Sequence, residues 1–370
     1  EAGQHLGTDL LSSFICNGVI AGVGAVIVFL PQILILFLFI IILEDSGYMA
    51  RAAFIMDRLM RNLGLSGQSF IPMLSSFACA VPGILGTRVV AGRQQRLATI
   101  MAAPFMTCSA RLPVYTLLIA AFVPDVRYLG GTLNLQGLVL FGLYLLGIAG
   151  GSFTAWLIGK VFIASRKTNF LLEMPPYRMP KFISVGKKLF ARAIAFLKRA
   201  GTIIFAVTLV IWGLITFPTK PVVGSETESL PPSIEESYLG TMSKIVSPAF
   251  EPLGWDWKVT ASVIASFPAR EVIIAVLGTI YAMDTETEEG AVSLTKAIQS
   301  AVHPDGKPVY TLPMVLGLLI FFAFCLQCVS TMAVMRKETG TWKWPIGSWV
   351  YMTGVGYLSA FLIFQIGSKL

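Results

Sequence analysis

The sequence is poor in charge. Lys, Arg, Asp and Glu make up 13% of its 370 residues, whereas hydrophobic residues make up 55%. A soluble domain carries about 25% charged residues. Uncharged stretches of about 20 residues, the length that spans a bilayer core, recur along this chain. The composition predicts an all-α polytopic membrane protein and argues against a soluble α/β enzyme. The net charge of +8 is typical of basic cytoplasmic loops and does not imply nucleic-acid binding.

The chain also has little of what metal enzymes and nucleotide hydrolases use. Its two histidines, His5 and His303, both lie outside the apolar runs, which excludes a histidine-rich metal site of the usual kind. There is no G-x-x-x-x-G-K-[ST] phosphate loop and no H-E-x-x-H motif. We therefore expect no enzymatic activity and no GTP site in this chain.

The five cysteines do not form a disulfide framework, because they are odd in number and lie in apolar segments. Cys325 and Cys328 form a C-x-x-C pair within an apolar run. Thioredoxin-type redox chemistry needs a thiol at an exposed helix N-terminus, so this pair does not predict a redox role.

One apolar run, 68–86, is short and contains two prolines and two glycines. Helix breakers at membrane depth are tolerated only where the backbone is buried in protein or lines a cavity. Basic residues flank this run on both sides, which predicts a re-entrant or broken hairpin. A second broken segment near 323–331 would account for the basic residues that follow it. The apolar runs are 14–43, 68–86, 97–123, 134–164, 200–217, 259–283, 312–335 and 345–366, giving about 7–8 membrane segments.

The loops predict the orientation. Between Lys160 and Arg199 there are ten Lys or Arg and one acidic residue, so this segment should be cytoplasmic. Within it, 181–199 alternates basic and apolar positions at helical spacing and predicts an amphipathic helix on the inner surface. We expect the carboxyl end in the cytoplasm. The expected parts are a first membrane bundle at 1–165, a basic amphipathic segment at 166–199 and a second membrane bundle at 200–370, with an external loop at 218–257 and a polar loop at 284–311.

Cys79, Cys108 and Cys328 each have a hydroxyl within three residues. Thiol, thioether and hydroxyl donors together suit borderline-to-soft transition metals. Charges inside membrane segments are costly and suggest function. Simple packing of the cysteines, solvation of acidic residues at a helix end and pairing of Glu271 with an arginine remain alternatives. The candidate residues of an ion path beside the cysteines are Glu44, Asp45, Ser75, Ser76, Met106, Glu271, Ser330 and Thr331.

Five blocks, in order over nearly the whole chain, resemble the membrane region of the prokaryotic ferrous iron transport protein B family. They are LEDSGYMARAAFIMDRLM (43–60), SFACAVPGILGTR (76–88), APFMTCSARLPVY (103–115), SFPAREVIIAVLGTIY (266–281) and LQCVSTMAVMRKETGTWKWP (326–345).

The resemblance implies Fe²⁺ transport into the cytoplasm across the inner membrane. It also implies two Gate segments, at about 31–123 and 205–335 here. The family's gate cysteines carry over to Cys79 and Cys328, and Cys108 matches a third position. Many members read GCNVP where this chain reads ACAVP, which removes one polar group from that motif.

The same resemblance implies partners. The family has an amino-terminal GTP-binding domain, which we expect outside this chain, and a small cytosolic partner of the same transport system. Membrane lipid is expected, a homo-oligomer stays open and nucleic acid is not expected. One alternative function is a non-transporting membrane module that docks a GTPase or regulator through its basic inner surface. Another is a transporter of a different divalent metal or of a nucleoside, for which Gln32 and Gln327 would be contacts.

Overall fold

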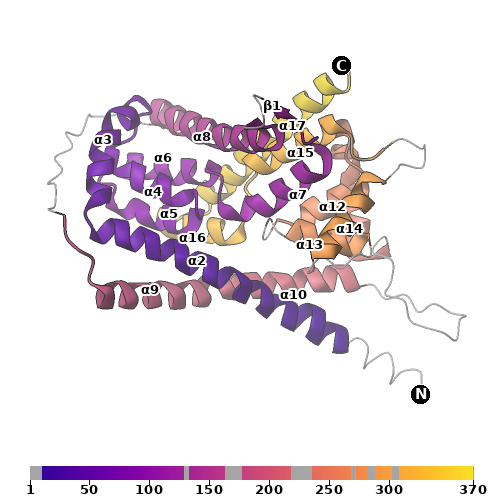
Figure 1. Cartoon of the computed structure of the whole chain (residues 1–370), viewed down its shortest axis with the longest axis horizontal. Helices are drawn as coiled ribbons and strands as arrows, with labels where there is room; N and C mark the ends of the chain where they lie inside the picture. The colour runs from indigo at the N-terminus through magenta and orange to yellow at the C-terminus, as the bar shows by residue number, and fades with distance from the viewer. Residues whose placement is uncertain are drawn as a thin grey trace, which may run out of the picture. The chain divides into compact units, whose positions relative to one another are not determined.

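The computed structural model describes residues 11–128, 133–162, 177–217, 236–267, 270, 272–281, 288–301 and 308–369. Most of the described chain is helical (Figure 1). Its two strands, β1 (Arg127–Tyr128) and β2 (Leu133–Asn134), have two residues each and pair antiparallel. The predicted all-α fold is therefore confirmed.

Contacts divide the chain into two compact units. Two of the three unit boundaries fall within α2 (Ala21–Asp45) and α9 (Phe182–Phe196), and the third directly precedes α15 (Leu312–Phe324). Unit 1 comprises Glu1–Ile33 and Ala193–Tyr310, and unit 2 comprises Leu34–Arg192 and Thr311–Leu370. Unit 1 contains α10 (Thr202–Thr216), α11 (Tyr238–Val246), α12 (Trp257–Ala265), α13 (Val272–Ile280) and α14 (Glu288–Gln299). Unit 2 contains α3 (Tyr48–Asn62), α4 (Phe70–Ser76), α5 (Ala80–Gly86), α6 (Arg93–Ala102), α7 (Leu112–Phe122), α8 (Leu135–Phe162), α15 (Leu312–Phe324), α16 (Val329–Thr339) and α17 (Lys343–Gly367).

Three segments of the described chain are long and apolar enough to cross a membrane: Arg93–Phe122, Leu135–Gly159 and Lys343–Gly367. Large apolar side chains on α8 and α17, among them Phe141 and Leu362, are exposed, as expected of helices that face lipid. Shorter apolar helices cover Leu11–Gly24, Thr202–Thr216 and Leu312–Phe324. The polytopic helical architecture agrees with the sequence, and the number of crossings stays a prediction.

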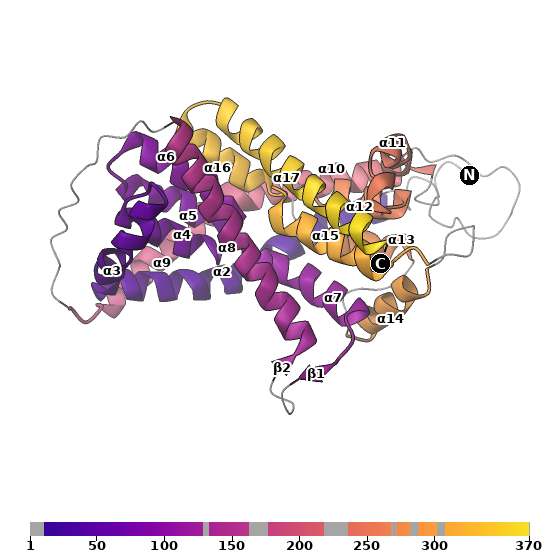
Figure 2. The same ribbon diagram turned by 90° about the horizontal axis from the view of Figure 1, so that it is seen from above.

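In unit 2, α15 and α17 lie side by side (Figures 1 and 2). Small residues allow this approach: a Cβ at Gly317 would lie 3.2 Å from the Ala360 oxygen, and one at Gly356 would lie 3.2 Å from the Phe321 oxygen. Close backbone approach at small residues is typical of membrane helix pairs. The pairing places the last helices of the chain in the same unit as α3–α8.

The amphipathic helix expected at 181–199 corresponds largely to α9. Phe182, Ile183 and Phe190 are exposed, whereas Val185 is buried. The Nζ of Lys188 lies 2.5 Å from Oδ1 of Asp45, at the end of α2. An exposed apolar face on a basic helix fits the predicted location on the inner membrane surface, which stays a prediction.

Candidate functional site

The run at 68–86 folds as two seven-residue helices separated by a break. Helix α4 ends at Ser76 and α5 begins at Ala80. Between them, Cys79 has an extended backbone, with φ −155° and ψ 132°. The two ends of the hairpin meet, because the Ala91 amide donates to Oε1 of Gln68 over 3.2 Å. The predicted broken hairpin is therefore confirmed, and its location in a membrane remains a prediction.

The two arms of this hairpin touch at Gly83. A Cβ on Gly83 would lie 1.9 Å from Oγ of Ser76 and 2.8 Å from the carbonyl oxygen of Pro72. Ser76 is fully buried, and its hydroxyl donates to that same carbonyl over 2.8 Å. Of the two glycines in the motif, Gly83 is therefore needed for contact, whereas a Cβ on Gly86 would meet nothing closer than 3.8 Å.

A second break interrupts the segment Arg93–Phe122 at Met106–Cys108, within a run that the sequence analysis treated as continuous. Cys108 is again extended, with φ −86° and ψ 162°. The buried guanidinium of Arg111 holds the preceding turn by donating to three carbonyl oxygens, those of Pro104, Phe105 and Met106, over 2.8–3.0 Å. These bonds satisfy carbonyls that the helix break would otherwise leave without a donor.

The third break is the one predicted near 323–331. Helix α15 ends at Phe324, α16 begins at Val329 and the four residues between them include both Cys325 and Cys328. Cys328 is extended, with φ −163° and ψ 104°, and directly precedes α16. Cys325 is 1% exposed, whereas Cys328 is half-buried.

The three breaks belong to one packed region of unit 2. The amide and hydroxyl of Ser109 both donate to the carbonyl of Ala78, over 3.3 and 3.0 Å, which joins the first break to the second. The rings of Phe105 and Phe324, 6.0 Å apart in an edge contact, join the second to the third. Helix α5 also packs against α16. The fold thus gathers three segments, each with a cysteine immediately before a helix.

The cysteines do not form a closed metal cage. In the part of the chain that the structure describes, no three His, Cys, Asp or Glu side chains gather so that they could hold a metal ion. All five cysteines lie in that part, and none is in a disulfide. The three candidate thiols are half-buried, as a thiol beside a passing ion would be. Their role as ligands stays a prediction.

The other predicted residues lie in different surroundings. Five of them are buried at the breaks or next to them: Ser75, Ser76, Met106, Ser330 and Thr331. Glu44 is exposed, and Asp45 forms the ion pair with Lys188, which fits the helix-end alternative. Glu271 lies outside the described residues, although its neighbour Arg270 is 4% exposed.

Thr107 is the most informative hydroxyl at the breaks. Its side chain is fully buried, and its Oγ1 has no hydrogen-bond partner among the described residues. Buried hydroxyls are normally paired, because burying one alone costs about 1–3 kcal/mol. An unpaired oxygen beside Cys108 is what a transient ligand would use. In the sequence, Thr107 is only one of several hydroxyl residues near a cysteine, and nothing there predicts that it is buried without a partner.

Substituting Gly147 on α8 tests this part of the site. In Gly147→Ala, the new Cβ would lie 2.7 Å from Oγ1 of Thr107 and 2.9 Å from the oxygen of Phe105. Because one of these atoms belongs to the backbone, we expect a loss of about 1–3 kcal/mol in the free energy of unfolding and slower ion passage. The matched control is Gly142→Ala on the same helix, where a Cβ meets nothing within 4 Å. Equal thermal stability and uptake in the two variants would contradict the close approach.

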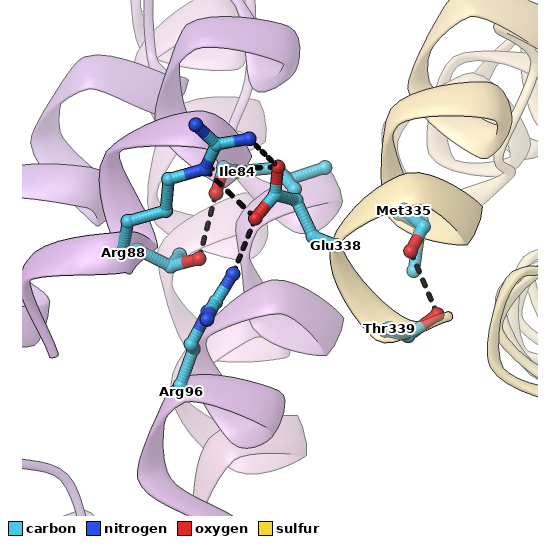
Figure 3. Close-up of polar contacts among 7 residues, drawn as sticks. Ile84, Arg88, Arg96, Met335, Glu338 and Thr339 are labelled. Atoms are coloured by element: carbon cyan, nitrogen blue, oxygen red, sulfur yellow. Dashed lines mark hydrogen bonds and ion pairs between the residues drawn. The ribbon is translucent and has the colours of Figure 1, made fainter. Parts of the chain in front are cut away.

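An acidic residue that the sequence did not point to, and whose side chain is shielded from solvent, lies at the far ends of α5 and α16. Glu338, whose side chain is 3% exposed, pairs with Arg88 and Arg96 (Figure 3). Nη2 of Arg88 lies 2.5 Å from Oε1, Nε of Arg88 lies 3.1 Å from both carboxylate oxygens, and Arg96 donates to Oε2. We call these three residues the clamp. In the sequence, Glu338 follows two basic residues and looks like part of an ordinary polar loop.

The clamp predicts a dependence of stability on pH. Burial raises the pKa of the Glu338 carboxyl, but hydrogen bonds and charges from Arg88 and Arg96 outweigh burial and bring the pKa below its usual value. Such a group stabilises the fold fully above its unfolded pKa of about 4.3, and this contribution is lost as pH falls through the folded pKa. We expect the melting-temperature difference between the parent and Glu338→Gln to be constant from about pH 6 to 8 and to shrink below about pH 4. A difference that already shrinks between pH 8 and 6 would contradict this assignment.

Comparison with known proteins agrees with the sequence blocks. A family profile described as Gate, nucleoside recognition, matches residues 26–122 and 197–342. A second, described as ferrous iron transport protein B C terminus, matches residues 140–192. The Fe(2+) transporter FeoB of Leptospira biflexa is 44% identical over 368 residues, which cover 100% of this chain and 53% of that protein. The chain belongs to the ferrous iron transport protein B family.

Other family members match over similar ranges. The Fe(2+) transporter FeoB of Leptospira interrogans serovar Lai is 44% identical, over 98% of this chain and 52% of that protein. A Porphyromonas gingivalis protein named as a fusion of Fe(2+) transport protein A and Fe(2+) transporter FeoB is 39% identical, over 95% of this chain and 44% of that protein. The chain spans about half the length of these relatives. No solved structure matches it.

The two Gate ranges give the site a simple description. They lie close to the expected Gate segments at 31–123 and 205–335. The first two breaks lie in the first Gate range, and the third lies in the second. In the clamp, both arginines come from the first range and the carboxylate from the second. The site therefore combines the two Gate segments.

Proposed function

We propose that this chain is the membrane permease region of a ferrous iron uptake transporter. In this proposal, Fe²⁺ passes between the three helix breaks, beside Cys79, Cys108 and Cys328. The observation that carries the proposal is the packing of three cysteine-bearing breaks from both Gate ranges into one region. We infer Fe²⁺ as the substrate from the relatives that are named Fe(2+) transporters.

The donor set suits an ion that must leave again. Thiols with nearby hydroxyls favour a borderline metal such as Fe²⁺ over Mg²⁺ or Ca²⁺. Conduction needs ligands that replace part of the water shell without holding the ion tightly. Separated thiols, with the unpaired hydroxyl of Thr107 between Met106 and Cys108, meet that need better than a closed set of four cysteines. The same hydroxyls and thiols could also bind Mn²⁺ and Zn²⁺, so the transport assay compares these ions with Fe²⁺.

The basic residues give the path a direction. Arg88 and Arg96 are joined to Glu338 near the ends of α5 and α16, and Arg336 and Lys337 lie in the last turn of α16. Basic residues collect on the cytoplasmic side, so we place this end of the helices there. Because α17 starts at this end and is long enough to cross a membrane, this placement puts the carboxyl end outside and replaces the expectation drawn from the loops. An inside-negative potential would then draw Fe²⁺ inward. The free energy gained by moving a divalent ion across 100 mV is about 4–5 kcal/mol.

Control by a GTP-binding part is proposed from the family. The curated relatives are about twice as long as this chain, which leaves room in them for such a part. The Porphyromonas gingivalis fusion joins a transport protein A to its transporter, and a small cytosolic partner of that kind is proposed here. The exposed face of α9 is the basic surface on which a cytosolic partner would act.

Fe²⁺ flux into anaerobic proteoliposomes tests the proposal. The chain is reconstituted alone with an inside-negative potential, and Fe²⁺, Mn²⁺, Zn²⁺ and a nucleoside are compared. The expected result is flux that prefers Fe²⁺ and disappears without the chain. Preferential flux of a nucleoside or of another metal would show that Fe²⁺ is not the substrate. Tight binding of a GTPase without any flux, also after the amino-terminal part of a relative is added, would favour the docking module.

A further inference from the structure

The side chain of Glu338 is shielded from solvent and paired with two arginines. Its side chain is 3% exposed, whereas the side chains of Arg88 and Arg96 are 57% and 30% exposed. Both of its oxygens are occupied by guanidinium donors, so Glu338 is not placed to bind Fe²⁺ itself. Removing one arginine would leave the shielded carboxylate with a partly uncompensated charge, which is costly.

The clamp sits at the opposite ends of two helices from the cysteines. Helix α5 begins directly after Cys79 and leads to Arg88, and α16 begins directly after Cys328 and reaches Glu338 in its last turn. Each cysteine thus precedes its clamp residue by about two and a half helical turns, or roughly 14–15 Å of axial rise. Since α5 and α16 also pack against each other, a fixed point at one end limits their sliding and rotation at the other.

We propose that Glu338 is a positioning residue that ties the two Gate segments together and sets where Cys79 and Cys328 lie relative to each other. This role rests on the proposed function, in which these thiols line the ion path. Arg96 extends the tie to α6, which leads into the second break. One carboxylate thereby connects the helices that precede or follow all three cysteine-bearing breaks.

The positioning role and the transport function can be measured independently. Position is measured as the yield of a Cys79–Cys328 cross-link, formed in membranes by a short bifunctional maleimide and quantified by mass spectrometry of the linked peptides. Transport is measured as Fe²⁺ flux in proteoliposomes. The test variant is Glu338→Gln, which keeps the size of the side chain and removes its charge. The matched control is Lys337→Gln, because Lys337 is the exposed neighbour on the same helix and takes no part in the clamp.

In Glu338→Gln we expect both the cross-link yield and the flux to fall by about tenfold, a size typical of coupled, buried charge pairs. Lys337→Gln should leave both unchanged. The reversed pair, Arg88→Glu with Glu338→Arg, should recover part of both, whereas Arg88→Glu alone should not. This comparison also holds if Glu338→Gln folds poorly.

A cross-link that fails to form in the parent, or forms equally in Glu338→Gln and the parent, would overturn the positioning role. If the cross-link responds to the clamp while no variant carries Fe²⁺, the positioning role stands and the proposed function fails. If flux falls in Glu338→Gln while the cross-link does not change, the clamp acts on transport by another route, and the positioning role is wrong.

Discussion

Replacing Cys79 and Cys328 together by serine should reduce Fe²⁺ flux by about tenfold or more, as expected when groups that bind or orient a metal ion are lost. Serine offers a harder and weaker donor than sulfur to a borderline ion. The substitution should not disturb the helices, because each cysteine is the extended residue directly before a helix, where serine is favoured. A loss of flux with an unchanged melting temperature would therefore report on the path and not on folding.

The chain contains its own control for the serine substitution. Cys16 is exposed and lies outside both the three breaks and the Gate ranges. Cys16→Ser should leave Fe²⁺ flux unchanged, and the two single gate variants should fall between the parent and the double variant. Full flux in the folded double variant would remove the thiols from the path and leave hydroxyls and carbonyls as its ligands.

Gly83→Ala should be among the most damaging small substitutions in the chain. Its Cβ would lie 1.9 Å from Oγ of Ser76 and 2.8 Å from the backbone oxygen of Pro72, and the second atom cannot rotate away. The arms α4 and α5 would have to separate, at a cost of about 2–4 kcal/mol in the free energy of unfolding. We expect a lower melting temperature and little remaining flux, because Cys79 lies at the turn of this hairpin.

Gly86→Ala is the matched control for Gly83→Ala. Both glycines lie in α5, but a Cβ at Gly86 would stay in ordinary contact, 3.8 Å from Pro72. Since alanine is the better helix former, this variant should be as stable as the parent or more stable. Equal behaviour of the two variants, measured by thermal unfolding in detergent, would show that the arms do not approach at Gly83.

Local sequence was sufficient for two of the three breaks. Prolines and glycines in an apolar run predicted the hairpin around Cys79, and an otherwise puzzling group of basic residues predicted the break before α16. The break at Met106–Cys108 was not predicted, although its run contains Pro104, Arg111 and Pro113, because the run is long enough to cross a membrane as one helix. The turn is held by Arg111, whose three carbonyl partners emerge only from the fold. A run of apolar residues alone does not distinguish a continuous helix from one that a buried arginine interrupts.

The clamp could not be predicted from the sequence, for a different reason. Arg88 and Glu338 are 250 residues apart, and their pairing depends on how α5 packs against α16. Periodicity and local charge patterns carry no information on such a contact. The acidic residues that the sequence favoured, Glu44 and Asp45, lie at an accessible helix end, where one of them binds a lysine. The buried carboxylate instead follows two basic residues that seemed to mark only a loop.

We propose that the half-buried thiols at the three breaks line the path of Fe²⁺. The most direct test of this proposal is the rate at which a small alkylating reagent modifies each cysteine of the reconstituted chain, measured anaerobically by mass spectrometry with and without Fe²⁺. We expect Fe²⁺ to slow modification of Cys79, Cys108 and Cys328 and to leave the exposed Cys16 unaffected. Equal rates at the three break cysteines with and without Fe²⁺, under conditions where the chain carries the ion, would contradict it.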